Sequence, residues 1–308
     1  MDDSKNLSLE EALFLIKANG KSFYWASFFL TKKITNEAIT LYSFCRLLDD
    51  LADDKFNKLI ELQNYKNSLI QMPIKINGSN IVDFLDRHKI KQTVIKDLID
   101  GFIFDQGVVR IENKQQLIIY CYQVAGTVGL MMSSILKPTK ICANKFAIDL
   151  GIAMQLTNIA RDVKEDACEH KRQYLPAEMI SNVSFEELLS ISLGKKNNEK
   201  KQNISKVILE ILKISNLYYD SGMSGLRYLP IRSHMAIGIA ALVYRQIGIK
   251  LIKNNFKWDE ERTYLSAVEK FFISIKILPH LFKRFLKEPI HEELLHKDFK
   301  GKINANYF

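Results

Sequence analysis

The sequence predicts an all-α fold built as a single-domain helical bundle, and three observations carry this prediction. Apolar residues recur at helical spacing in most segments, while the alternating pattern of strands is rare. Proline residues stand almost only at segment edges, where they do not interrupt helices. The 308 residues are 47% hydrophobic, enough for one large core. We expect one domain over residues 1–308, with a core at about 9–286 and a flexible tail at 289–308.

The predicted elements follow from caps, breakers and periodicity. Ser8 and Ser184 precede apolar periodic segments and are expected to cap helices. Residues 73–80, with Gly78, and the polar residues 194–203 are expected to form loops. The expected helices cover residues 9–17, 37–54, 81–87, 91–109, 114–136, 141–166, 185–192, 204–222, 231–254 and 260–276.

Charge and cysteine usage narrow the functional class. Lys and Arg number 44 against 35 Asp and Glu, and a net charge of +9 suits nucleic acid, an anionic membrane surface or phosphorylated ligands. No nucleic-acid motif accompanies the basic residues, so no nucleic-acid partner is expected.

The four cysteines form no CxxC pair, which is typical of reduced thiols in a cytoplasm. No signal core is present and the longest uncharged apolar run, 235–244, is too short to span a membrane; a cytoplasmic protein, at most peripheral to a membrane, is expected.

The strongest chemical signal is the acidic run Asp49-Asp50-Leu51-Ala52-Asp53-Asp54. On a helix Asp49 and Asp53 share one face, with side chains roughly 6 Å apart, so their like charges repel. Such a pair persists where both carboxylates are solvated or where a cation binds between them. Mg²⁺ prefers oxygen ligands and also binds substrate phosphates. The apolar residues directly before the run favour the cation over a solvated acidic face.

A second pair, Asp162 and Asp166, repeats this spacing at the end of an apolar stretch. Gln155 and Asn158 precede the pair at helical steps, so the four side chains are predicted to form one polar stripe. A polar stripe on a helix of Ile, Ala, Met and Leu is hard to explain as surface. The two clusters together predict that Mg²⁺, with Mn²⁺ as an alternative, binds diphosphate substrates here.

Basic residues near the clusters are candidates for phosphate binding. Arg46 lies three residues before Asp49, and Arg161 directly precedes Asp162. Together with Lys21 they offer guanidinium and ammonium donors to a diphosphate. For each of them a local ion pair is the alternative interpretation.

Two further segments carry residues that can contribute to ligand sites. Residues 124–129 place two glycines in a predicted helix, where each costs roughly 1 kcal/mol, so either a neighbouring helix packs closely or a ligand finds room. His291 and His296 resemble a zinc-binding HExxH motif, but they are five residues apart and would leave the common face of a helix. No zinc site is therefore expected. Neither a GxGxxG nor a P-loop motif is present.

The two acidic motifs resemble those of the squalene/phytoene synthase family. Residues 42–50, Tyr42-Ser43-Phe44-Cys45-Arg46-Leu47-Leu48-Asp49-Asp50, are similar to its first aspartate motif, and residues 155–166 to its second. Lys21-Ser22-Phe23, Tyr120-Cys121-Tyr122 and Arg172-Gln173-Tyr174-Leu175-Pro176 match in the expected order. The resemblance covers roughly residues 14–285, and segments 229–233 and 244–248 are similar to bacterial phytoene synthases. Two departures are Asn19, where members often have His, and Lys171, where a usual Gly would make a turn.

The resemblance implies an isoprenoid-synthase-type bundle with a central apolar cavity, where two prenyl diphosphates are joined head to head through a cyclopropyl diphosphate. For phytoene synthases the substrate is geranylgeranyl diphosphate, and transient membrane contact and carotenoid-pathway enzymes are implied partners. Asp49 and Asp53 would hold Mg²⁺ on one diphosphate, and Asp162 and Asp166 on the other. The other implied site residues are Tyr42 and Arg46, which would be catalytic, and Lys21, Ser22, Phe23, Tyr120, Val124, Ala125, Val128, Gly129, Gln155, Asn158, Arg161 and Tyr244.

Two alternatives stay open at the level of the sequence. One is a thirty-carbon sibling that uses farnesyl diphosphate, namely a dehydrosqualene, presqualene diphosphate or squalene synthase. The other is a non-catalytic helical assembly factor built on the same fold, which would be expected to lose the aspartates. All four aspartates are present here, which favours an enzyme.

Overall fold

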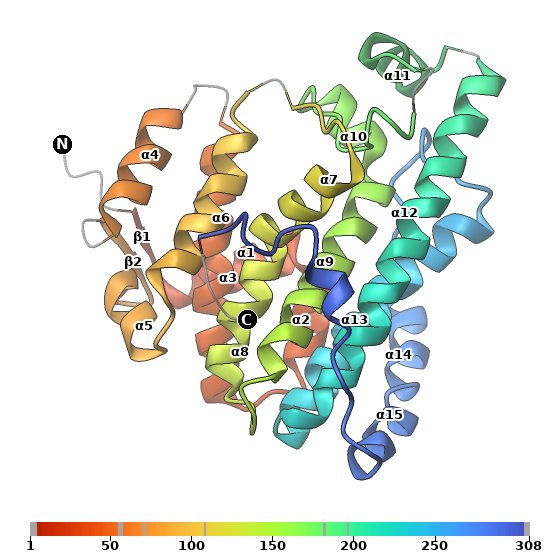
Figure 1. The fold of residues 1–308 in the computed structure, drawn as a ribbon. Coiled ribbons are helices and arrows are strands. Elements are labelled where there is room, and N and C mark those ends of the chain that lie inside the picture. The colour runs from red at the N-terminus through yellow and green to blue at the C-terminus, as the bar shows by residue number, and fades with distance from the viewer. Residues whose placement is uncertain are drawn as a thin grey trace.

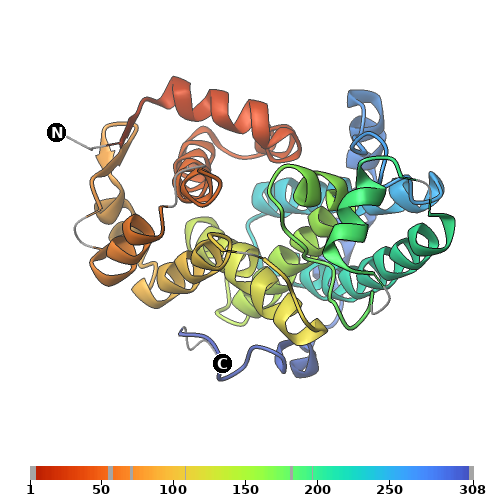
Figure 2. The ribbon, with the colours of Figure 1, turned by 90° about the horizontal axis from the view of Figure 1, so that it is seen from above.

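The chain folds into a bundle of α-helices with a small sheet at one edge. The computed structural model describes residues 5–54, 58–69, 72–107, 109–180, 183–195 and 197–304. In Figure 1 the longer helices run roughly along one axis, and Figure 2 shows the N-terminal helices on one side and the later ones on the other. The all-α prediction is confirmed.

The helices alternate with short connections along the whole described chain. The N-terminal third forms α1 (Leu9–Asn19), α2 (Lys21–Ser27), α3 (Lys32–Ala52), α4 (Leu59–Asn67), α5 (Ile81–Arg87) and α6 (Gln92–Phe104). The middle forms α7 (Lys114–Cys121), the π-helical turn η2 (Tyr122–Gly126), α8 (Thr127–Leu136), α9 (Ala143–Arg161), α10 (Val163–Cys168) and α11 (Phe185–Ser192). The remainder forms α12 (Asn198–Gly225), η3 (Leu226–Tyr228), α13 (Ile231–Lys253), α14 (Ala267–Ile275), α15 (Leu278–Phe282), η4 (Lys283–Phe285) and η5 (Glu293–His296).

The predicted loop at 73–80 is instead a hairpin in a three-stranded sheet. Strand β2 (Ile74–Ile76) pairs in parallel with β1 (Lys5–Leu7) and antiparallel with β3 (Ser79–Asn80). Asn77 and Gly78 both have positive φ, as a tight hairpin turn requires. Three residues are too few for an alternating pattern to stand out in the sequence.

Side-chain caps set several helix starts. Ser8 and Ser184 accept hydrogen bonds from the backbone N–H groups of Glu11 and Glu187, whose carboxylates bond back to the capping residues, as predicted. Thr31 caps α3, which therefore begins at Lys32 rather than at residue 37.

Several predicted helices differ from the structure near the cavity. The stretch 114–136 contains the π turn η2, and the stretch 141–166 breaks at Asp162, whose φ of −104° and ψ of 15° leave the helical region. The stretch 260–276 becomes helical only at Ala267, because Ser266 is its cap. The expected loop 194–203 is helical from Asn198 onward.

Helix α9 lies in the middle of the bundle against α8, η2, α12 and α13. Glycines allow this close approach. A Cβ added at Gly129 would lie 2.2 Å from the carbonyl oxygen of Ala147, and one at Gly151 would lie 2.2 Å from that of Ala125. Close helix packing, one of the two interpretations of segment 124–129, is therefore confirmed, and residues of the same segment also line the central cavity.

The C-terminal segment, expected to be flexible, packs across the outside of the bundle as far as residue 304 (Figure 1). Phe299 has no exposed surface and stacks on Tyr122 with ring centroids 4.8 Å apart. The side chain and backbone N–H of Asn304 donate to Asp97, each at 2.8 Å. Residues 305–308 lie outside the described part of the chain.

His291 and His296 converge, contrary to the prediction from their spacing. Residues 293–296 form a 3₁₀ turn and not an α-helix, so the two rings approach to 4.4 Å between centroids. Their Nε2 atoms lie 2.9 and 2.7 Å from the carboxylate oxygens of Asp149. Burial would raise the pKa of Asp149, but hydrogen bonds from both histidines hold it below its usual value.

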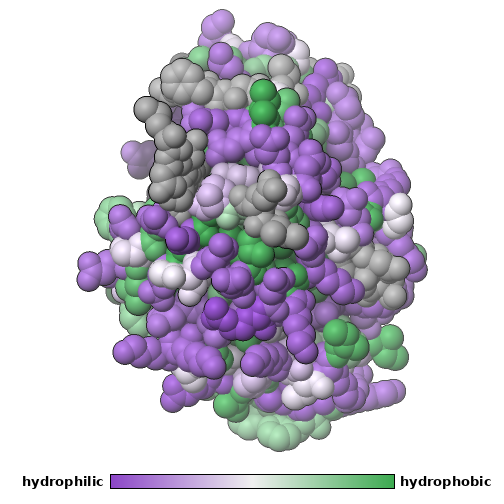
Figure 3. Space-filling model, turned by 90° about the vertical axis from the view of Figure 1, so that its left-hand side faces the viewer, coloured by the Kyte–Doolittle hydropathy of each residue, from purple (hydrophilic) through white to green (hydrophobic). Residues whose placement is uncertain are grey.

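The surface is mostly hydrophilic on the face seen in Figure 3, with a hydrophobic area in its middle. Two helical stretches, Lys114–Leu136 and Ile231–Lys253, are long and apolar enough to span a membrane by length and composition alone. In each stretch 56% of the most apolar window is buried inside the bundle, as in core helices of soluble proteins. The expectation that no uncharged apolar run reaches this length was wrong, because residues 115–136 carry no charged side chain.

We expect Gly151→Ala to destabilise the protein by about 1–3 kcal/mol, because the new methyl group would force α9 away from η2. Thermal and urea unfolding of the two proteins measure this loss. The matched control is Gly107→Ala, since a Cβ at Gly107 meets no atom within 4 Å. Equal losses for both variants would contradict the close approach.

Candidate active site

A cavity of about 340 Å³ opens between α2, α3, α6 to α9, α12 and α13. This volume is typical of small-molecule sites. Asp49 and Arg46 lie at its wall beside mostly apolar and aromatic side chains. The predicted site residues that line it are Phe23, Tyr42, Arg46, Asp49, Tyr120, Val124, Ala125, Val128, Gly129, Gln155, Asn158 and Tyr244.

The first acidic pair lies at the C-terminal end of α3. Asp49 is in the last helical turn, and Asp53 is the residue that ends the helix, with its N–H bonded to the carbonyl of Asp49 at 3.0 Å. Arg46 bridges Asp49 and Asp50, with N–O distances of 2.8 and 2.5 Å. The helix thus presents both predicted carboxylates one turn apart.

The second pair flanks the break between α9 and α10. Asp162 ends α9, and the N–H of Asp166 bonds to the carbonyl of Asp162 at 2.9 Å. The predicted stripe on one continuous helix is therefore wrong in detail, although one turn still separates the two residues. Arg161 donates two hydrogen bonds to the Asp162 carboxylate, at 2.6 and 2.5 Å.

Each pair contains one carboxyl group, Asp49 or Asp166, whose pKa is raised. Burial, and then the charge of Asp53, raise the pKa of Asp49 to about 7. Burial, and then Asp162 and Glu165, raise the pKa of Asp166 well above its usual value. A divalent cation would relieve this repulsion, because positive charge favours the ionised form.

Two arginines that the motif analysis did not select hold the acidic residues in place. Arg172 bonds to Asp53 at 2.7 Å, and its backbone N–H bonds to the carbonyl of Asp166, so it connects the two pairs. Arg262 bonds to Asp162 at 2.8 Å from the irregular segment before α14. The sequence placed Arg172 in a motif similar to the family's but indicated no role for it. Arg262 lies in the stretch 260–276, which was wrongly predicted to be helical from its start.

Several polar atoms of the site are buried without a partner. The Nε–H groups of Arg46, Arg172 and Arg262 have no hydrogen-bond acceptor in the described part of the chain. The side-chain oxygen of Asn158 likewise has no donor there, while its nitrogen donates to Gln155 at 3.3 Å. Buried donors and an orphan acceptor together fit an anionic ligand with bound cations.

Aromatic side chains form the cavity wall next to Asp49 and Arg46, which we call the acidic end of the cavity. Phe23 lies between Tyr42 and Tyr244, at 6.4 and 5.2 Å between ring centroids. Burial raises the pKa of Tyr244 above its usual value. All three residues line the cavity.

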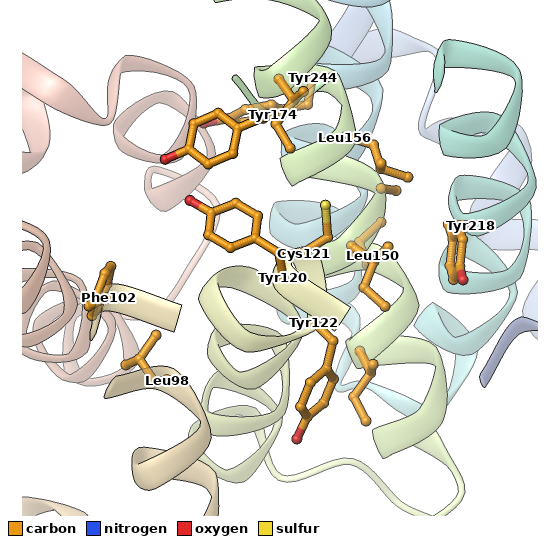
Figure 4. Close-up of a cluster of buried hydrophobic side chains, with 14 of the residues drawn as sticks. Leu98, Phe102, Tyr120, Cys121, Tyr122, Leu150, Leu156, Tyr174, Tyr218 and Tyr244 are labelled. Carbon is orange, nitrogen blue, oxygen red and sulfur yellow. The ribbon is translucent and has the colours of Figure 1, made fainter. Parts of the chain in front are cut away.

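A buried carboxyl orients a second aromatic pair. The rings of Tyr120 and Tyr174 stack at 4.8 Å, and Figure 4 shows their hydroxyls on the same side. Both hydroxyls donate to Asp105, at 2.9 and 2.7 Å. Burial raises the pKa of Asp105 to about 6, although Arg172 acts against this rise. Sequence reasoning missed Asp105, which stands outside the matched motifs.

Some predicted site residues do not line the cavity. Ser22 is buried, and the ammonium of Lys21 lies 5.5 Å from the ring centroid of Tyr264. Asp53, Asp162, Asp166 and Arg161 lie near its acidic end through the contacts described above and do not line it.

The turn questioned at Lys171 does form. Lys171 has a φ of +55°, the left-handed region that glycine adopts most easily. The turn brings the N–H of Arg172 to within 2.8 Å of the carbonyl of Asp166. The lysine therefore keeps the shape that Arg172 needs, at a conformational cost of roughly 1 kcal/mol.

Comparisons with known proteins identify the family of the chain. Residues 16–269 match the family model described as squalene/phytoene synthase. A 15-cis-phytoene synthase of Enterobacter agglomerans is 33% identical over 275 residues, which are 84% of this chain and 91% of that protein. A phytoene synthase of Thermus thermophilus is 31% identical, over 90% and 94% of the two chains.

Solved structures with the same fold complete the comparison. The crystal structure of a dehydrosqualene synthase in complex with a ligand matches with a TM-score of 0.76 and 25% identity, over 89% of this chain and 96% of the other. A squalene synthase of Alicyclobacillus acidocaldarius, at 16% identity and a TM-score of 0.67, covers 80% of this chain and 94% of its own and shares the fold. The chain therefore belongs to the squalene/phytoene synthase family.

Proposed function

We propose that this protein is a 15-cis-phytoene synthase that joins two molecules of geranylgeranyl diphosphate head to head. The observation that carries the proposal is the gathering of carboxylates and arginines at one end of an otherwise apolar cavity. The reaction passes through the cyclopropyl compound prephytoene diphosphate and releases two pyrophosphates. It would be the first committed step of carotenoid biosynthesis.

The acidic end fits Mg²⁺, with Mn²⁺ as the alternative ion. The two aspartate pairs offer oxygen ligands, and the raised pKa values of Asp49 and Asp166 indicate carboxylates that gain from a cation. In this proposal Asp49 and Asp53 serve one diphosphate, and Asp162 and Asp166 serve the other. Bound Mg²⁺ would neutralise the charge that develops on the departing pyrophosphates.

The arginines would bind and orient the diphosphates. Arg46, Arg172 and Arg262 each carry an unpaired buried Nε–H, which can donate to a phosphate oxygen. Arg161 would steady Asp162 through its paired hydrogen bonds. Lys21, exposed at the start of α2, and the buried Ser22 would mark the entrance for the substrate.

The apolar wall would protect the cationic intermediates. Because Val124, Val128 and their neighbours line the cavity with apolar side chains, they would keep water away from a carbocation bound there. The faces of Phe23, Tyr42 and Tyr244 would stabilise positive charge, each by about 0.5–2 kcal/mol. A pyrophosphate oxygen or a tyrosine would accept the lost proton.

A thirty-carbon sibling is the second candidate, and the structural likeness to a dehydrosqualene synthase favours it. Two observations support the forty-carbon product instead. The relatives at 31–33% identity are phytoene synthases. Small side chains in the cavity wall, among them Ala125, Ala143 and Ala240, suit a longer chain better than bulky ones would. The presence of all four aspartates speaks against a non-catalytic assembly factor.

We also propose that the chain works as one domain.

The segment from α14 to η4, residues 267–285, is proposed to contact an anionic membrane when the lipophilic product leaves. Phe271, Phe272, Phe282 and Phe285 are each more than half exposed along this segment. Lys270, Lys276, Lys283 and Arg284 lie among them in the sequence. Exposed aromatic residues with interspersed basic ones suit the interface of an anionic bilayer.

Purified protein with Mg²⁺ should convert geranylgeranyl diphosphate to phytoene, identified by mass analysis, at a kcat/KM at least about tenfold above that for farnesyl diphosphate. Asp49→Asn and Asp166→Asn should each lower turnover about 10²-fold or more, because a cation ligand is lost. Asp86→Asn, on the exposed face of α5, is the control. A thirty-carbon product as the main species would instead support the sibling enzyme.

In the absence of divalent ions, Asp49 and Asp105 should favour folding as the pH falls from 8 to 6, whereas burial lowers the pKa values of His88, His234 and His280 and these residues act in the opposite sense. The pKa values of Asp49 and Asp105, about 7 and about 6, are higher in the folded chain than in an unfolded one, so folding takes up protons. Melting temperatures at the two pH values, with chelator and with Mg²⁺, measure this effect. Because Mg²⁺ competes with protons at the carboxyls, it should raise the melting temperature more at pH 8 than at pH 6. An equal effect of Mg²⁺ at the two pH values would argue against the cation site.

Vesicles that contain anionic lipid should bind the protein more tightly than neutral vesicles, as measured by co-sedimentation. Replacing Phe271 and Phe282 together by Ser should weaken this binding at least about tenfold, since both rings would lose apolar burial. Phe14→Ser, which changes a similarly exposed ring on α1, should have little effect. If Phe14→Ser weakened vesicle binding as much as the double variant does, the proposed membrane contact of α14 to η4 would be contradicted.

A further inference from the structure

The C-terminal segment carries a polar cluster that the proposed reaction does not use. Residues 286–304 lie beyond the family match, which ends at residue 269. The segment crosses α12, α9, η2 and α6 on the outside of the bundle (Figure 1). Its centre is Asp149 on α9, which has no exposed surface. The next residues along the helix, Leu150 and Gly151, line the cavity.

We propose that Asp149, His291 and His296 form a binding site for a transition-metal dication such as Zn²⁺, separate from the Mg²⁺ sites. The two imidazoles and the carboxylate each offer a ligand atom, and these atoms all lie within 4.8 Å of one another. Imidazole nitrogen suits Zn²⁺ and other first-row transition ions, whereas Mg²⁺ prefers oxygen alone. The two classes of site therefore select different metals.

The geometry needs only small adjustments to accept the ion. Ligand atoms bound to one tetrahedral Zn²⁺ at about 2.0–2.1 Å are about 3.3 Å apart. The two histidine Nε2 atoms now lie 2.9 and 2.7 Å from the oxygens of Asp149. The ion would take the place of the two Nε2 protons, which leave to solvent or move to Nδ1. Water would fill the fourth position, as in other sites with three protein ligands.

Groups around the cluster suit a second coordination sphere. Nδ1 of His291 lies 3.9 Å from a carboxylate oxygen of Glu293, close to the arrangement in which a ligating histidine donates its other N–H to a carboxylate. Lys145 on α9 holds Glu293 at 2.5 Å. The hydroxyl of Ser221 donates to Asp149 and fixes its orientation. The ion would thus fasten the tail to the helix whose other residues line the cavity.

The test uses the full-length protein, stripped of metal with chelator and returned to saturating Mg²⁺, so that the aspartate pairs are occupied. Added Zn²⁺ at about 100 times its Kd should raise the melting temperature by about 5 °C. Elemental analysis after dialysis should find one zinc per chain. Co²⁺ in its place should give the visible absorption of a low-coordinate site with nitrogen ligands.

Matched variants separate this site from the others. His291→Gln and His296→Gln should each abolish the zinc-dependent shift, whereas Asp49→Asn should keep it, because Asp49 belongs to the Mg²⁺ sites. His280→Gln, on α15, is the matched histidine control and should also keep the shift. The shift is compared with and without zinc for each protein, so a change in basal stability does not interfere. If His296→Gln does not fold, His291→Gln gives the same comparison.

Absence of bound zinc and of any zinc-dependent shift in the unmodified protein would overturn the proposal. The cluster would then be a hydrogen-bonded lock in which both imidazoles donate to Asp149. Retention of zinc by both histidine variants would overturn it equally. None of these readouts needs a prenyl substrate, so the outcome is independent of the proposed reaction.

Discussion

Like-charged carboxylates crowded at one end of an apolar cavity are the constraint on which the rest of the structure depends. Burial and mutual repulsion raise the pKa values of Asp49 and Asp166, and arginines offset part of that cost. The same arginines carry unpaired N–H groups, so they can also bind an anion. In the proposed function, such a site would become more stable when diphosphates bind together with their cations. This shared requirement explains why basic and acidic residues gather where an apolar cavity ends.

Much of the fold and of the candidate site could be predicted from local sequence patterns. The spacing of Asp49 and Asp53 after an apolar helix, and its repetition at Asp162 and Asp166, depends only on helix geometry and charge. Helix periodicity also predicted α5 and α11 with their observed bounds. Twelve of the predicted site residues line the cavity because the motifs fall on the inner faces of α2, α3, α7 to α9 and α13. Such features are encoded within a few helical turns.

Features that depend on distant contacts could not be predicted in this way. The break at Asp162 places its carboxylate against Arg161 and Arg262, and Arg262 comes from a segment whose apolar spacing resembles a helix. Asp105 acquires its role only when Tyr120 and Tyr174 stack beside it. His291 and His296 meet because a 3₁₀ turn, not an α-helix, joins them. In each case tertiary packing selects a backbone geometry that the local sequence leaves open.

The most direct measurement is the location of Mn²⁺ by anomalous diffraction in crystals grown with an unreactive prenyl diphosphate analogue. The account predicts manganese at both aspartate pairs, bridged to phosphate oxygens, with the prenyl chain along the cavity wall that includes Val124, Val128 and Gly129. Manganese at neither pair, with the diphosphate bound elsewhere on the protein, would contradict the central claim.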